Sequence, residues 1–187
     1  MIESKHFEGT DFTKDLLPKN AYELCTFEGC NFSNSDISNI TFNECEFIDC
    51  DISNTNVKHT TFNDVQFVDC KLLGLHFNDC DDLFISMNFK KCNLEFAVFY
   101  DLNLKKTNFR NCVLKGTDFS YSNLTESIFE SCDMKSAIFD NTILEKADLR
   151  SSFNLNIDPE NNNIKKARFS KENLAGLLLK YQISVES

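Results

Sequence analysis

Residues 41–70 read TFNECEFIDC DISNTNVKHT TFNDVQFVDC and carry an apolar residue at every fifth position. The same spacing runs without a miss from Phe27 to Phe77 and, after one step of seven residues, from Phe84 to Leu149. These 25 centres hold 14 of the 19 Phe residues. Two residues before the centre, 20 of the 25 repeats have Ala, Cys, Ser, Thr or Val. The chain is therefore built from one short internal repeat.

A five-residue period fits neither an α-helix nor a flat strand. Five steps of about 100° carry successive centres around a helix, and an odd step moves a side chain to the other face of a strand. The chain must therefore turn once in each repeat. Four turns per coil give a period of 20 residues, with coils stacked at about the 4.8 Å spacing of paired strands.

The cysteines support four repeats per coil. Two sets of three are spaced by 20 residues, and 22 residues separate the sets: Cys30, Cys50 and Cys70, then Cys92, Cys112 and Cys132. A two-residue bulge near residues 78–83 would place all six in one column, and would place Phe84 between Phe62 and Leu104 in another. We therefore predict an all-β solenoid, a quadrilateral β-helix with four interior columns of apolar side chains.

The two ends differ from the regular repeats, which we expect over residues 25–153. Residues 1–24 keep the five-residue phase but include Pro18, and are expected to form an irregular N-terminal coil or cap. In residues 154–187, Ser170 can cap a helix over about 171–181, whose apolar residues recur at helical spacing. We expect this segment to cap the last coil and to form a dimer through Leu174, Leu177, Leu178, Leu179, Tyr181, Ile183 and Val185.

The repeat pattern resembles that of the pentapeptide repeat family, whose members are right-handed quadrilateral β-helices with the Leu or Phe centre and the small residue inside. The tail, from Asn156-Ile-Asp-Pro-Glu to Ser170-Lys-Glu-Asn-Leu-Ala-Gly-Leu-Leu, is similar to that of the topoisomerase-protecting subgroup, which includes the Qnr quinolone-resistance proteins and the microcin B17 immunity protein. That resemblance implies a homodimeric acidic rod. The chain departs from the Gram-negative quinolone-resistance proteins, which carry two sizeable loops where this sequence allows only the short bulge.

Acidic residues are concentrated in the first half of the chain. The net charge of −10 excludes a protein that binds nucleic acid or an anionic membrane by neutralising phosphates. Residues 27–82 carry 11 acidic and 2 basic residues over about 13 Å of solenoid. Duplex DNA carries about eight charges over that length. The candidate contacts with a topoisomerase are Glu44, Glu46, Asp49, Asp51, Asp64, Asp69, Asp79, Asp81 and Asp82. Solubility alone would also explain such a surface.

A second candidate surface is apolar. Outward positions of the C-terminal half carry Phe96, Val98, Tyr100, Tyr121 and Ile138. Exposed aromatic patches often mark protein contacts. Shielding of neighbouring coils, or contact with the tail, is the alternative explanation for these residues.

The sequence offers few candidates for a catalytic site or a metal site. All nine Cys residues fall at the small-residue position, so we expect reduced interior thiols rather than disulfides or a metal site. The three His residues are isolated, and no Ser-His-Asp set can be assembled. We expect no cofactor. The N-terminus lacks a signal-peptide pattern and no run of 18 apolar residues occurs, which favours a cytoplasmic protein. The family resemblance implies that its source is bacterial.

Together these observations and the family resemblance predict a non-enzymatic homodimer that mimics DNA, binds DNA gyrase or a related type II topoisomerase, and protects it from quinolones or a peptide toxin. The alternative is a generic β-helical scaffold that binds another protein through the apolar face. Neither hypothesis includes direct binding to nucleic acid or to a membrane.

Overall fold

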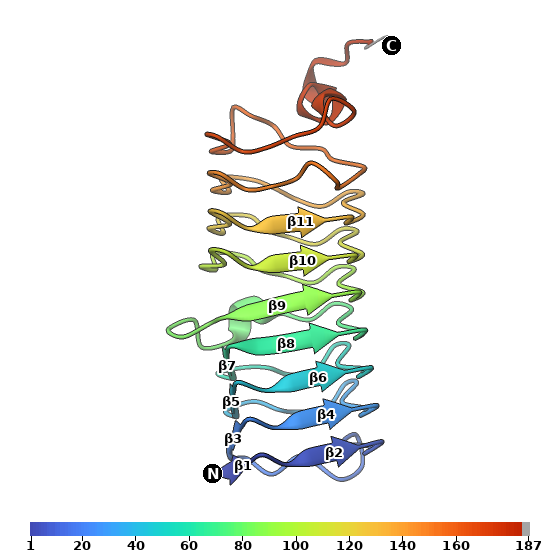
Figure 1. The fold of residues 1–187 in the computed structure, drawn as a ribbon, viewed down its shortest axis with the longest axis vertical. Coiled ribbons are helices and arrows are strands. Elements are labelled where there is room, and N and C mark those ends of the chain that lie inside the picture. Colours follow the sequence, from blue (N-terminus) through green and yellow to red (C-terminus); the bar gives the residue numbers. More distant parts are fainter. Residues whose placement is uncertain (185–187) are drawn as a thin grey trace.

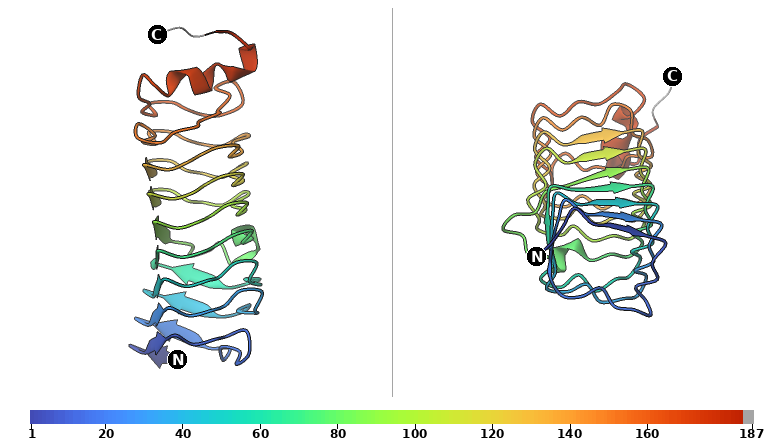
Figure 2. Two further views of the ribbon diagram at one scale, coloured as in Figure 1. Left: turned by 90° about the vertical axis from the view of Figure 1, so that its right-hand side faces the viewer. Right: turned by 60° about the horizontal axis from the view of Figure 1, so that its bottom comes forward.

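The computed structural model describes residues 1–184 and winds them into one right-handed solenoid (Figure 1). Every strand pairs in parallel with the strand one coil away. The strands are β1 (Ile2–Glu3), β2 (His6–Glu8), β3 (Ala21–Glu23), β4 (Thr26–Glu28), β5 (Thr41–Asn43), β6 (Glu46–Ile48), β7 (Thr61–Asn63), β8 (Val65–Val68), β9 (Met87–Lys90), β10 (Asn108–Arg110) and β11 (Ile128–Glu130). They form a four-stranded sheet, β1-β3-β5-β7, and a seven-stranded sheet, β2-β4-β6-β8-β9-β10-β11. Isolated bridges complete the other sides of the four-sided coils (Figure 2).

Corners with left-handed backbone explain why the chain bends every fifth residue. The residue two places after most centres has a positive φ, as at Asn34 (54°), Asp49 (51°) and Gly74 (59°). Asn, Asp and Gly tolerate this conformation better than other residues. Their frequency outside the apolar centres therefore follows from the geometry of the turn.

The interior is a set of stacked aromatic columns, as the repeat predicts. The ring centroids of Phe47 and Phe67 lie 5.2 Å apart, and those of Phe67 and Phe89 lie 5.3 Å apart with planes 7° from parallel. Neighbouring columns meet edge to face, as Phe42 and Phe47 do at 5.2 Å and 73°. Such offset-stacked and edge-to-face contacts are the favoured arrangements of aromatic rings. All of these rings are buried.

The small residues before each centre also point inward, and their polar atoms are satisfied by the backbone. The Cys50 thiol donates to the Phe27 carbonyl at 3.3 Å, and the Thr60 hydroxyl donates to the Ile37 carbonyl at 2.8 Å. All nine cysteines are free and buried. Within residues 1–184, no group of three or more His, Cys, Asp or Glu side chains is placed to hold a metal ion.

The buried thiols are expected to be unreactive in the folded protein. Burial raises the pKa of Cys45 to about 11 and also raises the pKa of Cys80, so little nucleophilic thiolate forms at these two positions at neutral pH. The buried position of all nine thiols keeps a reagent in solution away from them. Titration with a chromogenic disulfide reagent should detect nine thiols in strong denaturant and almost none within minutes in native buffer. Rapid reaction of several native thiols would contradict this arrangement.

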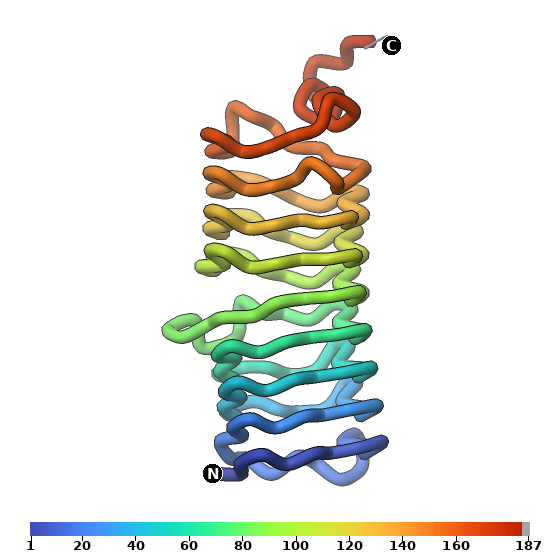
Figure 3. The backbone as a smooth tube through the Cα atoms, viewed as in Figure 1, coloured from blue at the N-terminus to red at the C-terminus, as the bar shows by residue number. Residues whose placement is uncertain are grey.

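The seven-residue step is a projecting loop, and the predicted position of Phe84 is wrong. A 3-10 helix, η1 (Phe77–Asp79), precedes a loop over residues 81–86 that leaves the solenoid beside β9 (Figure 3). Phe84 at the loop is 61% exposed, next to Leu83 at 73%. Ile85 packs against the core instead, and the regular pairing resumes where Met87 aligns with Val65.

The C-terminal segment covers the last coil. In place of one helix over about 171–181, it forms two short 3-10 helices, η2 (Leu174–Leu177) and η3 (Leu179–Tyr181). The buried Asn173 amide donates to the carbonyls of Leu149 at 3.0 Å and Ser152 at 2.8 Å. Gly176 lies against the Leu155 carbonyl, where a β-carbon would clash. None of the helices described is long and apolar enough for a membrane span.

Candidate protein-binding face

The outer face of the seven-stranded sheet runs along most of the solenoid and faces the viewer in Figure 1. In each strand the central Phe points inward, so the residue on either side points outward. The parallel register stacks these outward residues into columns, such as Glu46 on Gln66 and Glu28 on Ile48. Corner residues with positive φ border the face at both strand ends.

The N-terminal half of this face is strongly acidic. We call its seven carboxylates, on the coils of β2, β4, β6 and β8, the acidic wall. They are Glu8, Glu28, Glu44, Glu46, Asp49, Asp64 and Asp69, and all seven residues are exposed. Among the described residues, only Glu28 and Asp69 of this set form an ion pair, with His6 at 3.2 Å and with Lys91 at 3.7 Å. The wall therefore presents five carboxylates that no described cationic side chain neutralises.

Four carboxylates of the wall occupy the corners. Glu44 and Asp64 precede β6 and β8, whereas Asp49 and Asp69 follow these strands, and all four have φ near 50°. The backbone N–H groups of Glu44 and Asp49 donate to the next coil at 2.8 and 2.9 Å, so the corners are fixed by the ladder. The wall is therefore preorganised, and binding need not order its backbone.

The structure brings together only part of the predicted acidic set. Asp51 lies on the adjacent side, in a bridge with Lys71, whose ammonium is 4.0 Å from its carboxylate. Asp79 ends η1 on the far side of the coil. Asp81 and Asp82 lie in the projecting loop, where the Asp81 carboxylate accepts a hydrogen bond from the Leu83 N–H at 3.1 Å.

Two members of the wall, Glu8 and Glu28, were not among the predicted contacts. Each directly follows a centre, Phe7 or Phe27, and the two pair in register across β2 and β4. Extending the 20-residue column of outward positions back through the first coil would have identified them.

The C-terminal half of the same face carries mixed charges that pair between coils. Lys146 donates to Glu126 at 3.1 Å, and Arg110 lies 3.4 Å from Glu130. The Asp148 carboxylate is held by Arg150 at 2.7 Å and Arg168 at 3.1 Å. Hydrogen bonds from Lys146 and Arg150 lower the pKa values of Glu126 and Asp148, respectively. These carboxylates are therefore already partnered within the chain.

The middle of the face has a depression of about 240 Å³ over β8, β9 and β10, lined by Gln66, Val68, Asn88, Lys90, Asn108 and Arg110, with Phe67 and Phe89 at its base. Asn108 donates to the Asn88 side-chain oxygen at 2.8 Å, which joins the two coils. The depression offers amides and cations, and no nucleophile paired with a base.

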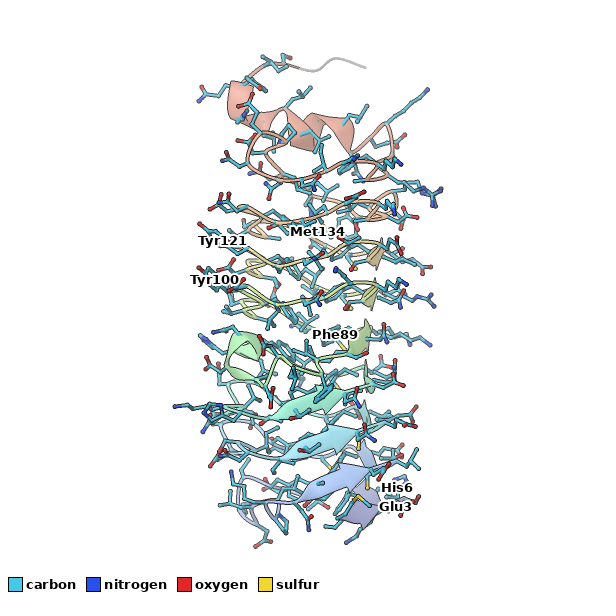
Figure 4. All side chains as sticks on the ribbon, turned by 90° about the vertical axis from the view of Figure 1, so that its left-hand side faces the viewer. Glu3, His6, Phe89, Tyr100, Tyr121 and Met134 are labelled. Carbon is cyan, nitrogen blue, oxygen red and sulfur yellow. The ribbon has the colours of Figure 1, made fainter. Side chains whose placement is uncertain are left out.

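The predicted apolar face is present but discontinuous. Tyr100 and Tyr121 are about half exposed, with ring centroids 5.3 Å apart, and lie side by side at one edge of the solenoid (Figure 4). Val98 and Ile138 stand in one outward column with Asp118 between them. Phe96, 68% exposed, lies at another corner with its ring against Gly116.

The predicted dimerisation residues divide into two groups. Leu177 and Leu178 are partly buried, and Leu177 packs against the core. Leu174, Leu179, Tyr181 and Ile183 are each about half exposed. Lys180 pairs with Asp158 at 2.7 Å and with Glu160, and Tyr181 donates to Glu160 at 2.7 Å, which fixes the segment on the last coils. Val185 lies outside the described residues.

Comparison with solved structures shows the fold. Full-length QnrB1, a plasmid-mediated fluoroquinolone resistance protein, matches with a TM-score of 0.58 and 15% identity, over 97% of this chain and 99% of QnrB1. A trypsin-treated form of QnrB1 matches with a TM-score of 0.59 and 18% identity, over 100% of this chain and 91% of that chain. No curated protein sequence matches the chain. The family model described as the pentapeptide repeat region matches residues 22–82 and 83–169. With the stacked five-residue repeats, this match establishes that the chain belongs to the pentapeptide repeat family.

Proposed function

We propose that this protein is a non-enzymatic DNA mimic that binds a type II topoisomerase, DNA gyrase, and protects it from quinolones or a peptide toxin. The observation that carries the proposal is the acidic wall, five of whose seven carboxylates have no ion-pair partner among residues 1–184. The fold likeness to a fluoroquinolone resistance protein supports the choice of target. The enzyme functions in the bacterial cytoplasm, where we place this protein.

The charge density of the wall is close to that of duplex DNA. Its seven carboxylates lie on four coils, which span about 14 Å at the spacing of paired strands. Duplex DNA presents about eight phosphates over the same length. Lys and Arg side chains that hold a DNA segment would meet a similar number of anions here. The hydrogen-bonded coils fix the backbone positions from which the carboxylates project.

We also propose that the protein forms a homodimer through the C-terminal segment. Leu174, Leu179, Tyr181 and Ile183 remain exposed after the segment has covered the last coil. Burying these side chains against a second copy would remove apolar surface from water. Light scattering should then give twice the 21.5 kDa chain mass. A monomer at working concentration would contradict this part of the proposal.

The test of the function is gyrase supercoiling with the protein added at micromolar concentration. We expect the protein to inhibit supercoiling at high concentration, and to restore supercoiling when ciprofloxacin is present at an inhibitory dose. Both effects should disappear at high salt, because the interaction is electrostatic. Absence of both inhibition and rescue at low salt would overturn the proposal.

A second candidate function is a scaffold that binds another protein through the tyrosine pair. The adjacent exposed rings of Tyr100 and Tyr121 favour this possibility, because exposed aromatic side chains often form the centre of interfaces. Replacing both with Ala would impair a scaffold and leave gyrase inhibition unchanged.

A further inference from the structure

The face of the seven-stranded sheet has opposite charge at its two ends. Its N-terminal half carries the seven carboxylates of the acidic wall and no Lys or Arg in the same columns. The same columns from β9 to residue 168 carry three acidic and eight basic residues, the latter being Lys90, Lys91, Lys106, Arg110, Lys146, Arg150, Lys166 and Arg168. The middle, at Gln66, Val68 and Asn88, is uncharged. The face is therefore electrostatically self-complementary.

We propose that two copies of the chain pack face to face through this sheet, with their solenoid axes antiparallel and a two-fold axis along the strands between β8 and β9. A two-fold contact joins the same patch on both copies. Antiparallel packing brings the acidic wall of each copy onto the basic half of the other, whereas parallel packing would oppose like charges. The inference goes beyond the proposed function and holds whether or not the target is a topoisomerase.

The columns of the sheet give the residue pairs of this interface. Under the proposed two-fold axis, each column of one copy faces the same column of the second copy. Strand β8 then lies opposite β9 of the second copy, and β6 lies opposite its β10. Asp69 then meets Lys91 of the second copy, Glu44 meets Lys106, and Glu8 meets Arg150. Each of these cations also has a partner in its own chain: Lys91 pairs with Asp69, Lys106 with Glu126 and Arg150 with Asp148. The other wall carboxylates Glu46, Asp49 and Asp64 face the uncharged Asn108, Asn111 and Ser86. One pair of like charges, Glu28 with Glu130, also faces, but Glu130 is already paired with Arg110 within its own chain at 3.4 Å.

The projecting loop adds an apolar contact at the same axis. The loop leaves the solenoid beside β9, at the level of the proposed axis and at one edge of the face (Figures 1 and 3). Its exposed Leu83 and Phe84 have little cover in the single chain, at 73% and 61% exposure. A two-fold axis at this level brings the loops of both copies together, which would cover these side chains. Charge complementarity and the loop therefore indicate the same arrangement.

This packing covers the acidic wall, so self-association and binding to a basic target exclude each other. Two of the three charge pairs, Asp69 with Lys91 and Glu44 with Lys106, lie at solvent-exposed corners, where salt screens them strongly. Dilution, salt or a target with a larger basic surface would release the wall. The contact acts as a reversible cover of the binding surface.

The decisive experiment is a charge swap between two variants. Variant one is Glu44→Lys with Asp69→Lys, and variant two is Lys91→Glu with Lys106→Glu. All four positions have φ between 51° and 63°, and natural Glu, Asp and Lys already occupy this conformation in the chain, so both variants should fold. Both are made with Leu179→Glu and Ile183→Glu, which removes association through the C-terminal segment. Circular dichroism melting checks folding.

Sedimentation at low salt should show each variant alone as a monomer, because its facing halves then have like charge. An equimolar mixture should form a heterodimer, because every swapped residue again meets an opposite charge. The Leu179→Glu, Ile183→Glu parent should self-associate, with an apparent dissociation constant that rises at least about tenfold between 50 and 500 mM salt. A control with Lys58→Glu and Asp101→Lys, both on other sides, should behave as this parent.

Two results would overturn the inference. One is a parent protein that stays monomeric at low salt and high concentration. The other is a mixture that associates no better than either variant alone. Failure of the charge swap would leave gyrase inhibition by the wild-type chain unaffected, so it is distinguishable from failure of the proposed function.

Discussion

Replacing Phe67 with Ala is expected to lower the free energy of unfolding by about 3–5 kcal/mol. Phe67 is 1% exposed and lies between Phe47 and Phe89, whose ring centroids are 5.2 and 5.3 Å away. The backbone ladder holds adjacent coils at the strand spacing, so the column cannot close over the missing ring and a cavity remains. Denaturant unfolding followed by circular dichroism measures the loss.

The same substitution at Phe84 is the matched control. Phe84 is 61% exposed in the loop, so Phe84→Ala is expected to change stability by less than about 0.5 kcal/mol. Equal losses for the two variants would contradict the assignment of one ring to the interior and the other to the surface.

Reversing four charges of the acidic wall is expected to weaken binding to gyrase at least about 100-fold. The variant combines Glu44→Lys, Glu46→Lys, Asp49→Lys and Asp64→Lys, none of which removes an ion pair among the described residues. Each change replaces an attraction to the basic surface of the enzyme with a repulsion. Titration of gyrase supercoiling gives the concentration of protein needed for half-inhibition.

The control for this variant makes the same change in net charge away from the wall, at Asp15, Asp101, Asp140 and Glu145. It should retain inhibition within a few-fold, because contacts and not overall charge determine binding. Equal loss in both variants would show that net charge alone governs the effect. Loss on replacing Tyr100 and Tyr121 with Ala, without loss on reversing the wall, would favour the scaffold.

The columns of the core could be predicted because one spacing is repeated through the chain and every coil faces the same packing problem. Phe47, Phe67 and Phe89 are related by 20 and 22 residues, and parallel stacking of the coils buries all three. The loop could not be predicted in the same way. Phe84 fits the five-residue phase as well as its neighbours do, and only the three-dimensional path shows that Ile85 packs against the core in its place.

The C-terminal segment shows a second limit of periodicity. The apolar spacing predicted one helix over about 171–181 that caps the last coil, yet Leu174 is 49% exposed and the polar Asn173 is buried. The two carbonyls at the end of the last coil need a hydrogen-bond donor, and the Asn173 amide supplies it. Close contact at Gly176 keeps the segment flat on the coil. The need for a hydrogen-bond donor at position 173 and for a glycine at position 176 cannot be read from the spacing of apolar residues.

The candidate site could be predicted only in part. A count of charges along the sequence does not show which side of the coil each charged residue occupies. Counted by column, five of the nine predicted acidic residues fall on one face, together with Glu8 and Glu28. The half from β9 onward has almost no net charge in the linear count, yet its basic residues gather on that same face. The opposite charges of the two halves became visible only once outward positions were assigned to sides of the coil.

Competition with DNA tests the central claim, that the acidic wall occupies a surface where the enzyme holds a duplex. Labelled protein bound to gyrase would be titrated with unlabelled linear DNA at constant low salt, and the bound fraction followed by fluorescence anisotropy. We expect DNA to displace the protein completely. The DNA concentration that displaces half of the protein should rise in proportion to the protein concentration once the protein saturates the enzyme. Binding that stays unchanged while DNA saturates the enzyme would contradict the claim.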